Sequence, residues 1–389
     1  MSLHSKKSAL GLMVVAIFFI SLNLRPAISS IGPLLETIRS DLNLSNSEVS
    51  LLTSVPVLCM GLFAPFAVWF NRRFGIKTSI TLLLSAIGLF TFFRMLVPSF
   101  AMLFFSSLFI GIAIAIIGPL VSAMIKRNFP TRTPALIGVY SFGMGLGATF
   151  AAGLTGLFYT LSNWPLALAS WSLLSIIGIV LWLRVEHPKD PVQERTGEGD
   201  TAKSPWKNKR AWYMMLFFAL QSALFFSMIT WLAPIAIDKG MSVLTAGAVL
   251  TLMSTVQLIA NIAIPILLGK YPSRFLWINV SLVIGTAGIL LIQFGSLALI
   301  WPAAVLLGLT LGTLFPIALL MPLDENTTAE DVNSWTAMIQ MGGYSLSAIM
   351  PFAIGLLYDR YATHTISLVM CLMLIAMMVL FAFLLNKKH

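Results

Sequence analysis

Long apolar runs recur from one end of this 389-residue chain to the other. Each run has about twenty or more residues, which is enough for a helix to cross a hydrocarbon layer about 30 Å thick. Hydrophobic residues make up 58% of the chain and charged residues only 10%, a composition typical of integral membrane proteins. The sequence therefore predicts an all-α membrane protein with twelve transmembrane helices, at residues 9–35, 48–70, 77–97, 100–125, 134–159, 164–184, 211–237, 242–268, 275–295, 297–321, 333–357 and 365–385.

The distribution of basic residues predicts how the chain crosses the membrane. Lysine and arginine gather in the cytoplasmic loops of membrane proteins, and with a cytoplasmic N-terminus 19 of the 24 basic residues fall on the inner side. We therefore expect both termini in the cytoplasm. The net charge of +10 then reflects topology, and we expect no nucleic-acid partner. The basic residues expected on the outer side are Arg39, Arg94, Lys239 and Arg360.

The first apolar run follows Lys6 and Lys7 and so resembles a signal peptide. The run is longer than the apolar part of a typical signal peptide, and it shows no clear cleavage site with small residues. We therefore expect it to remain as the first span. Cys59 and Cys371 both lie within spans, where we expect packed apolar thiols.

One long polar segment, residues 186–210, divides the chain. Its prolines, glycines and mixed charges are typical of a flexible linker. The six spans before it align with the six after it at nearly constant offsets: Gly111 pairs with Gly308 at 197, and Pro33 pairs with Pro234 at 201. Such steady offsets indicate an internal duplication.

The duplication defines two domains. We expect a six-helix bundle in residues 1–185, a cytoplasmic linker in 186–210 and a second six-helix bundle in 211–389. Two repeats of six helices in the same orientation are the plan of the major facilitator superfamily, in which the substrate binds between the halves near the middle of the membrane. We expect a monomer, with the lipid bilayer and a small-molecule substrate as its partners.

Arg25 lies inside the first apolar run, at membrane depth. A guanidinium group is costly there unless something pairs with it, so such a residue indicates a functional site. No Asp or Glu lies at comparable depth in any other run, which favours a ligand as the missing negative charge. Two alternatives stay open: Arg25 binds backbone carbonyl groups that Pro26 frees, or it pairs with Glu36.

The spacing of three and four residues places Ser21, Arg25, Ser29 and Gly32 on one face of the first helix. The repeat aligns Arg25 with Phe226, and Ser29 with Thr230, in the seventh span. The predicted site is therefore asymmetric, because a cation from one half faces an aromatic ring from the other.

Polar and aromatic residues of other spans complete the predicted site. Buried amides and phenols need partners, so each of them either binds the substrate or joins helices. Trp231 is either an interfacial anchor or a wall of the cavity. The glycine-rich fifth span lets helices approach closely, which is typical of a gate or of tight static packing. The predicted substrate-binding residues are Arg25, Ser21, Ser29, Tyr140, Phe226, Thr230, Trp231, Gln257, Asn261, Gln340 and Tyr344.

The sequence offers little for an enzyme. All four histidines lie in predicted loops or tails, and no carboxylate pair or cluster of metal ligands lies within the predicted spans. The glycines of the fifth span lack the Gly-Lys-Ser/Thr ending of a phosphate-binding loop. We therefore expect no enzymatic activity, no catalytic residues, no metal and no cofactor, and transport that is secondary or passive.

Several segments of the chain form a recognisable set. In the first half they are Leu22-Asn23-Leu24-Arg25-Pro26, the stretch from Pro56 to Pro65, Arg72-Arg73-Phe74-Gly75 and Lys126-Arg127-Asn128-Phe129-Pro130. In the second half they are Gln221-Ser222 with Trp231, and Gln340 with Gly343-Tyr344. These segments resemble one family within the superfamily, the cyanate and 2-nitroimidazole permeases. The resemblance implies a transporter of the bacterial inner membrane that binds its substrate at Arg25.

The chain also departs from that family. Phe226 stands where the resemblance implies a tyrosine, and Ala115-Ile116 stands where it implies an asparagine. The loop after the second span also lacks the acidic residue of the superfamily's Asp-Arg-x-Gly-Arg-Lys element, as members of the family often do. A less polar cavity favours an organic substrate over a small ion such as cyanate. We expect a secondary transporter that moves a small anionic or polar aromatic solute by alternating access. The alternatives are export of nitroimidazole-like or other drug-like compounds and, outside transport, a membrane ligand sensor.

Overall fold

The computed structural model describes residues 3–129, 132–185, 204–326 and 329–386. These residues form helices and no strand, which confirms the predicted all-α class. The first half contains α1 (Leu3–Asn23), α2 (Pro26–Ser29), α3 (Ile31–Asp41), α4 (Asn46–Leu62), α5 (Phe66–Leu96), α6 (Phe100–Asn128), α7 (Thr133–Leu161), α8 (Trp164–Ala169) and α9 (Ser172–Arg184). The second half contains η2 (Pro205–Lys207), α10 (Lys209–Asp238), α11 (Val243–Lys270), α12 (Arg274–Phe294), η3 (Leu297–Leu299), α13 (Ile300–Glu325), α14 (Ala329–Ser347), α15 (Ile349–Tyr361) and α16 (His364–Asn386).

Eleven helical segments of the described residues are long and apolar enough to cross a membrane. The remaining predicted span, residues 48–70, is divided: α4 has 17 residues, and the chain bends at 63–65 before it enters α5. The sequence predicts a loop between 70 and 77. The helical backbone is interrupted within this interval, at Gly75 of α5, whose φ of 72° and ψ of 163° are open to glycine but strained for other residues.

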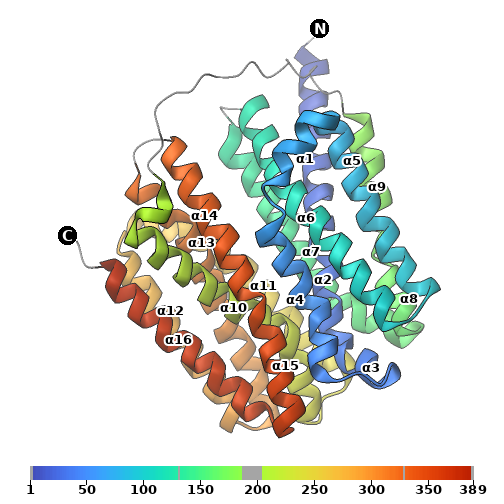
Figure 1. Ribbon diagram of the computed structural model, residues 1–389, viewed down its shortest axis with the longest axis vertical. Coiled ribbons are helices and arrows are strands. Elements are labelled where there is room, and N and C mark those ends of the chain that lie inside the picture. The colour runs from blue at the N-terminus through green and yellow to red at the C-terminus, as the bar shows by residue number, and fades with distance from the viewer. Residues whose placement is uncertain (1–2, 130–131, 186–203, 327–328, 387–389) are drawn as a thin grey trace.

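The linker predicted at 186–210 is described only from residue 204 onward, and residues 186–203 lie outside the described part of the chain. Lys209 and Arg210, which the sequence assigns to the linker, already form the first turn of α10. Figure 1 shows the first half, from blue to green, and the second half, from yellow-green to red, as two helical bundles side by side.

The two bundles repeat the same helix contacts. In the first half α4 packs on α6 and α1 packs on α7, while in the second half the equivalent α11 packs on α13 and α10 packs on α14. The contacts agree even at single residues. A Cβ atom on Gly111 would lie 2.5 Å from Pro56, and one on Gly308 would lie 2.5 Å from the carbonyl oxygen of Met253. The contacted residues, Pro56 and Met253, are 197 positions apart, which is also the offset between Gly111 and Gly308. The packing therefore supports an internal duplication.

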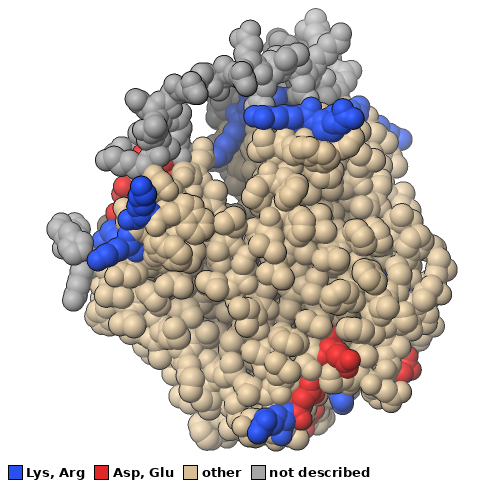
Figure 2. All heavy atoms as spheres, in the orientation of Figure 1, with Lys and Arg blue, Asp and Glu red and all other residues tan. Residues whose placement is uncertain are grey.

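The two ends of the molecule differ in charge. We call the end that carries Gly75, Arg184 and Lys270 the basic end, and the end that carries Asp41 and Asp238 the distal end. Figure 2 shows lysine and arginine side chains along the basic end, with some acidic side chains beside them in the second half, and acidic and basic side chains at the distal end.

Three of the four basic residues expected at the distal end lie there, at or near the ends of their helices: Arg39, Lys239 and Arg360. The prediction for Arg94 was wrong, because its side chain is 1% exposed and lies inside the first bundle. It lies there because polar groups of α2 and α6 satisfy its guanidinium.

The halves meet closely at the distal end. There α3 packs on α10 and α15 packs on α4, and α7 packs on α11 along much of its length. A Cβ atom on Gly32 would lie 2.3 Å from the carbonyl oxygen of Ile229, so α3 and α10 approach to a distance that only glycine allows. On the face shown in Figure 2, a notch separates the halves at the basic end, and the surface is continuous toward the distal end.

Candidate substrate-binding site

The first span is interrupted where the site begins. Helix α1 ends at Asn23, Leu24 and Arg25 form a turn, and α2 starts at Pro26. Proline lacks the amide hydrogen that would continue the helix and excludes the residue before it from ideal helical geometry. Arg25 lies at the turn between α1 and α2, and its backbone angles (φ −115°, ψ −34°) stay in the right-handed helical region. That Ser21, Arg25 and Ser29 share one face of the first span stays a prediction.

Arg25 reaches across the interface between the halves. Its guanidinium carbon lies 5.8 Å from the ring centroid of Phe225 and 6.0 Å from that of Phe226, both on α10. These distances are typical of cation–π contacts. The Tyr344 hydroxyl group on α14 and the Tyr140 hydroxyl group on α7 are close enough to interact electrostatically with this guanidinium.

Aromatic rings form the wall opposite Arg25. The ring of Phe226 lies 4.9 Å from that of Phe225 and 6.3 Å from that of Tyr344, and Phe218 lies 5.2 Å from Tyr344 in an edge-to-face arrangement. Such contacts fix the rings in place. The structure thus brings together four of the predicted site residues: Arg25, Tyr140, Phe226 and Tyr344.

No carboxylate of the described residues forms an ion pair with Arg25. Glu36, one of the two alternatives from the sequence, pairs instead with Arg39, whose Nε lies 3.0 Å from a Glu36 carboxylate oxygen. The guanidinium of Arg25 is partly buried and faces rings and hydroxyl groups, which leaves its charge available to an anion or to an electron-rich ring.

The two serines of the predicted stripe are buried. Ser21 is 0% exposed and donates to the carbonyl oxygens of Ile17 and Phe18 at 2.9 and 2.8 Å, against Gly143 of α7. Ser29 is 3% exposed within α2. The contacts of Ser21 are those of a residue that joins α1 to α7.

Thr230 and Trp231 lie on α10 between Phe226 and the distal end. The Thr230 hydroxyl group donates to that of Thr53 on α4 at 3.1 Å and so connects the halves. Trp231 is 1% exposed and donates from its indole nitrogen to the carbonyl oxygen of Pro351 at 3.0 Å. Trp231 therefore packs in the core of the second half, and it is not an exposed anchor.

The predicted amides lie on helices of the second half. Gln257 and Asn261 of α11 and Gln340 of α14 are partly buried. The buried side-chain oxygen of Asn261 has no hydrogen-bond partner among the described residues. A buried acceptor without a partner indicates space for a ligand or for water.

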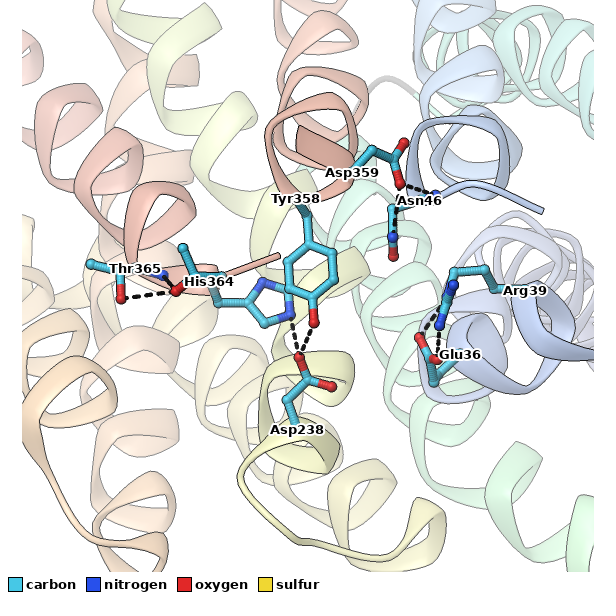
Figure 3. A network of polar contacts seen from close by, with 9 residues as sticks. Glu36, Arg39, Asn46, Asp238, Tyr358, Asp359, His364 and Thr365 are labelled. Atoms are coloured by element: carbon cyan, nitrogen blue, oxygen red, sulfur yellow. Dashed lines mark hydrogen bonds and ion pairs between the residues drawn. The ribbon is translucent and has the colours of Figure 1, made fainter. Parts of the chain in front are cut away.

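A second group of polar residues joins the two halves at the distal end (Figure 3). The Asp359 carboxylate on α15 accepts hydrogen bonds from the backbone amides of Asn46 at 2.7 Å and Ser47 at 2.8 Å, and from the Asn46 side chain at 2.9 Å. These amides form the first turn of α4, whose donors have no partners within the helix. A carboxylate from one half therefore caps a helix of the other, where the helix dipole favours negative charge.

Next to this cap, three residues of the second half bind one another. Asp238 accepts a hydrogen bond from the Tyr358 hydroxyl group at 2.6 Å and lies 3.2 Å from the His364 ring nitrogen. Figure 3 shows the Tyr358 and His364 side chains pointing toward Asp238, while the Glu36–Arg39 pair lies across from them in the first half. These residues join the distal ends of α10, α15 and α16.

Sequence reasoning missed three residues near the site. Phe225 was overlooked because the repeat aligns only Phe226 with Arg25. Asn23 belongs to the Asn-Leu-Arg-Pro segment that carries the family resemblance, but the sequence alone gave it no role. Arg94 lies within a predicted span, so the rule that singled out Arg25 applies to it equally.

Residues 12–343 match the Major Facilitator Superfamily, and the chain belongs to this superfamily of membrane transporters. More particularly, it is 29% identical to the cyanate transport protein of Escherichia coli (strain K12) over 89% of both chains. It is 27% identical to the 2-nitroimidazole transporter of the same strain, over 95% of this chain and 94% of that one. These similarities confirm the predicted resemblance and a transporter rather than an enzyme.

Two further comparisons agree. The chain is 29% identical to an uncharacterized transporter of Bacillus subtilis (strain 168), over 97% of this chain and 93% of that one. The solved structure of a D-xylose–proton symporter superposes with a TM-score of 0.81 at 12% identity and covers 97% of each chain. This last similarity concerns the fold alone.

Proposed function

We propose that the chain is a secondary transporter that moves a small anionic or polar aromatic solute across the bacterial inner membrane by alternating access. The solute binds between the halves at Arg25. The observation that carries the proposal is the position of this guanidinium at a helix break, partly buried, without a carboxylate partner among the described residues, and facing rings of the other half.

The arrangement suits solutes that combine charge or polarity with a flat ring. A guanidinium group offers paired donors to an anionic or acceptor group. The rings of Phe226 and Tyr344 can stack on an aromatic ring. The related 2-nitroimidazole transporter supports such a solute for this chain, and the related cyanate transport protein supports an anion.

Tyr140, Gln340 and Asn261 are proposed as further polar contacts of the solute. Thr230, Trp231, Ser21, Ser29 and Gln257 stay predictions as solute ligands. Of these, Thr230, Trp231 and Ser21 already make hydrogen bonds within the protein. We therefore propose that these three residues shape the cavity and do not bind the solute directly.

Alternating access requires one end of the interface to close while the other opens. The capped α4 terminus and the Thr53–Thr230 contact close the distal end, and the notch lies at the basic end (Figure 2). With the basic end in the cytoplasm, as the positive-inside rule favours, the described form is open to the cytoplasm.

Flux measurements in proteoliposomes with labelled cyanate and labelled 2-nitroimidazole test this proposal. The wild-type protein is expected to move at least one of them with saturation. Arg25→Lys keeps the charge and loses the two-pronged geometry, and we expect it to weaken binding by about 1.5–3 kcal/mol, or roughly tenfold to a hundredfold. Arg25→Ala is expected to abolish saturable flux.

The matched control is Arg360→Ala, which removes an exposed arginine at the distal end and should leave flux unchanged. Saturable flux that survives unchanged in Arg25→Ala would show that Arg25 does not bind the solute. If the wild-type protein moves neither compound, the proposed solute class is wrong.

A further inference from the structure

Arg94 is an arginine for which the transport site described above has no role. Its side chain is 1% exposed and lies on α5 within the first bundle. Burial of a guanidinium group costs free energy that must be recovered through hydrogen bonds. The partners of Arg94 therefore indicate what the residue is for.

Those partners come from two other helices. Nη1 of Arg94 donates to the carbonyl oxygen of Ala27 at 2.9 Å, Nε donates to the Ser106 hydroxyl group at 2.9 Å, and Nη2 donates to the Ser107 hydroxyl group at 3.3 Å. Ser106 and Ser107 lie on α6, whereas Ala27 lies on α2, two residues after Arg25. Arg94 thus ties the segment that follows the helix break to the body of the first bundle.

The preceding side of the break is tied as well. The side-chain amide of Asn23 donates to the carbonyl oxygens of Phe19 at 2.7 Å and Leu174 at 2.9 Å, and its oxygen accepts from the Ser175 hydroxyl group at 2.9 Å. Leu174 and Ser175 belong to α9. Arg25 therefore lies midway between two residues, Asn23 and Ala27, that are both held to neighbouring helices.

A carboxylate would satisfy the charge of Arg94 more simply, yet no ion pair to Arg94 occurs among the described residues. Neutral acceptors preserve the positive charge of the first bundle. They also let the planar, five-donor guanidinium bind three groups in fixed directions, which an ammonium group cannot do.

We propose that Arg94 is a positioning residue for Arg25. By holding the carbonyl group of Ala27, it fixes the direction in which the chain leaves the break, and so fixes where the Arg25 guanidinium meets the rings of the second half. Asn23 supplies the second fixed point on the other side of the break. The proposal rests on the proposed function only for the statement that Arg25 binds the solute, since the position of Arg25 is measurable without any solute.

Fluorine NMR of protein labelled with 3-fluorotyrosine measures that position. The chain has seven tyrosines, and Tyr140 and Tyr344 interact electrostatically with Arg25. Their two resonances are assigned with Tyr140→Phe and Tyr344→Phe, and Arg25→Lys shows how far they move when Arg25 itself changes. Arg94→Lys is expected to shift both resonances while those of Tyr213 and Tyr271, near the basic end of the second half, stay in place.

The matched control is Arg39→Lys, a basic residue of the distal end that pairs with Glu36; it should leave the Tyr140 and Tyr344 resonances in place. If Arg94→Lys does not fold, Ser106→Ala removes one acceptor of Arg94 and should give a smaller shift of the same two resonances. A role limited to packing predicts a lower melting temperature with both resonances unmoved. That result, or a shift of all seven resonances together, would overturn the proposal.

Discussion

Two arginines lie away from bulk water in the first half, and their surroundings differ. Arg94 is 1% exposed and places three of its donors on protein acceptors. Arg25 is partly buried and faces aromatic rings of the other half. The first guanidinium completes a network of polar groups, whereas the second has no carboxylate partner among the described residues and is the one proposed to bind the solute.

This difference predicts opposite effects on stability. Arg94→Ala leaves a carbonyl group and two hydroxyl groups buried without their donor and opens a cavity, so we expect a loss of about 2–4 kcal/mol. Arg25→Ala removes a charge that has no protein carboxylate as partner, so its stability should stay within about 1 kcal/mol of the wild type. Melting temperatures of both variants in the same detergent check this contrast. A larger loss for Arg25→Ala than for Arg94→Ala would contradict it.

At the scale of helices, two helix ends present groups that the proposed mechanism uses. The break before α2 presents Arg25, and the first turn of α4 receives the Asp359 carboxylate from the other half. Unpaired amides at a helix start bind an anionic group well, and a carboxylate on α15 supplies that group only while the distal end is closed. Under the alternating access proposed above, the cap is a contact that breaks when the distal end opens.

Asp359→Asn tests that statement, because it removes the charge and one acceptor from the cap. The distal end should open more often, with closure weakened by about 1–2 kcal/mol. Spin labels at Leu161→Cys and Leu297→Cys, both exposed at the distal end, report the change as longer distances in double electron–electron resonance. Asp324→Asn at the basic end is the matched control. Identical distance distributions for Asp359→Asn and the unsubstituted protein would show that the Asp359 cap does not hold the distal end closed.

Much of this architecture could be predicted from the sequence, because apolar runs and repeat offsets depend on local composition. The site was predictable only in part. Pro26 signalled a disturbed helix, yet nothing in the spacing showed that α1 ends at Asn23 and that Arg25 lies in a turn before α2. The contact between Trp231 and Pro351 joins residues 120 positions apart, and only tertiary packing reveals it. The charge distribution predicted Arg94 on the outer side of the membrane. Its burial depends on acceptors that other helices supply, and the sequence pattern does not show which helices are neighbours.

At the scale of the whole molecule, the two halves are alike in packing and unlike in chemistry. The contacts of Gly111 and Gly308 coincide under the repeat, while Arg25 and Arg94 both belong to the first half. Acidic side chains near the basic end are neutralised within the second half, where Asp324 accepts from Arg274 at 2.7 Å and Glu325 from Arg210 at 2.5 Å. The surplus of basic residues at this end favours a cytoplasmic position for it.

That orientation is testable with an impermeant thiol reagent on single-cysteine variants in which Cys59 and Cys371 are replaced by alanine. Leu161→Cys at the distal end is expected to react in intact cells, and Lys207→Cys at the basic end only after the membrane is permeabilised. Both positions are exposed, so a difference in labelling reports sidedness. The opposite pattern would reverse the proposed topology.

The acceptors of Arg94 also have a consequence for the order in which the protein is built. A helix that carries an arginine is unstable alone in lipid, and α5 finds its acceptors in α2, which is made before it, and in α6, which is made directly after it. The third span can therefore settle in the bilayer only as part of a group with the first and the fourth. All three acceptors of Arg94 are in the membrane once α6, which ends at Asn128, has been inserted, long before the second half exists.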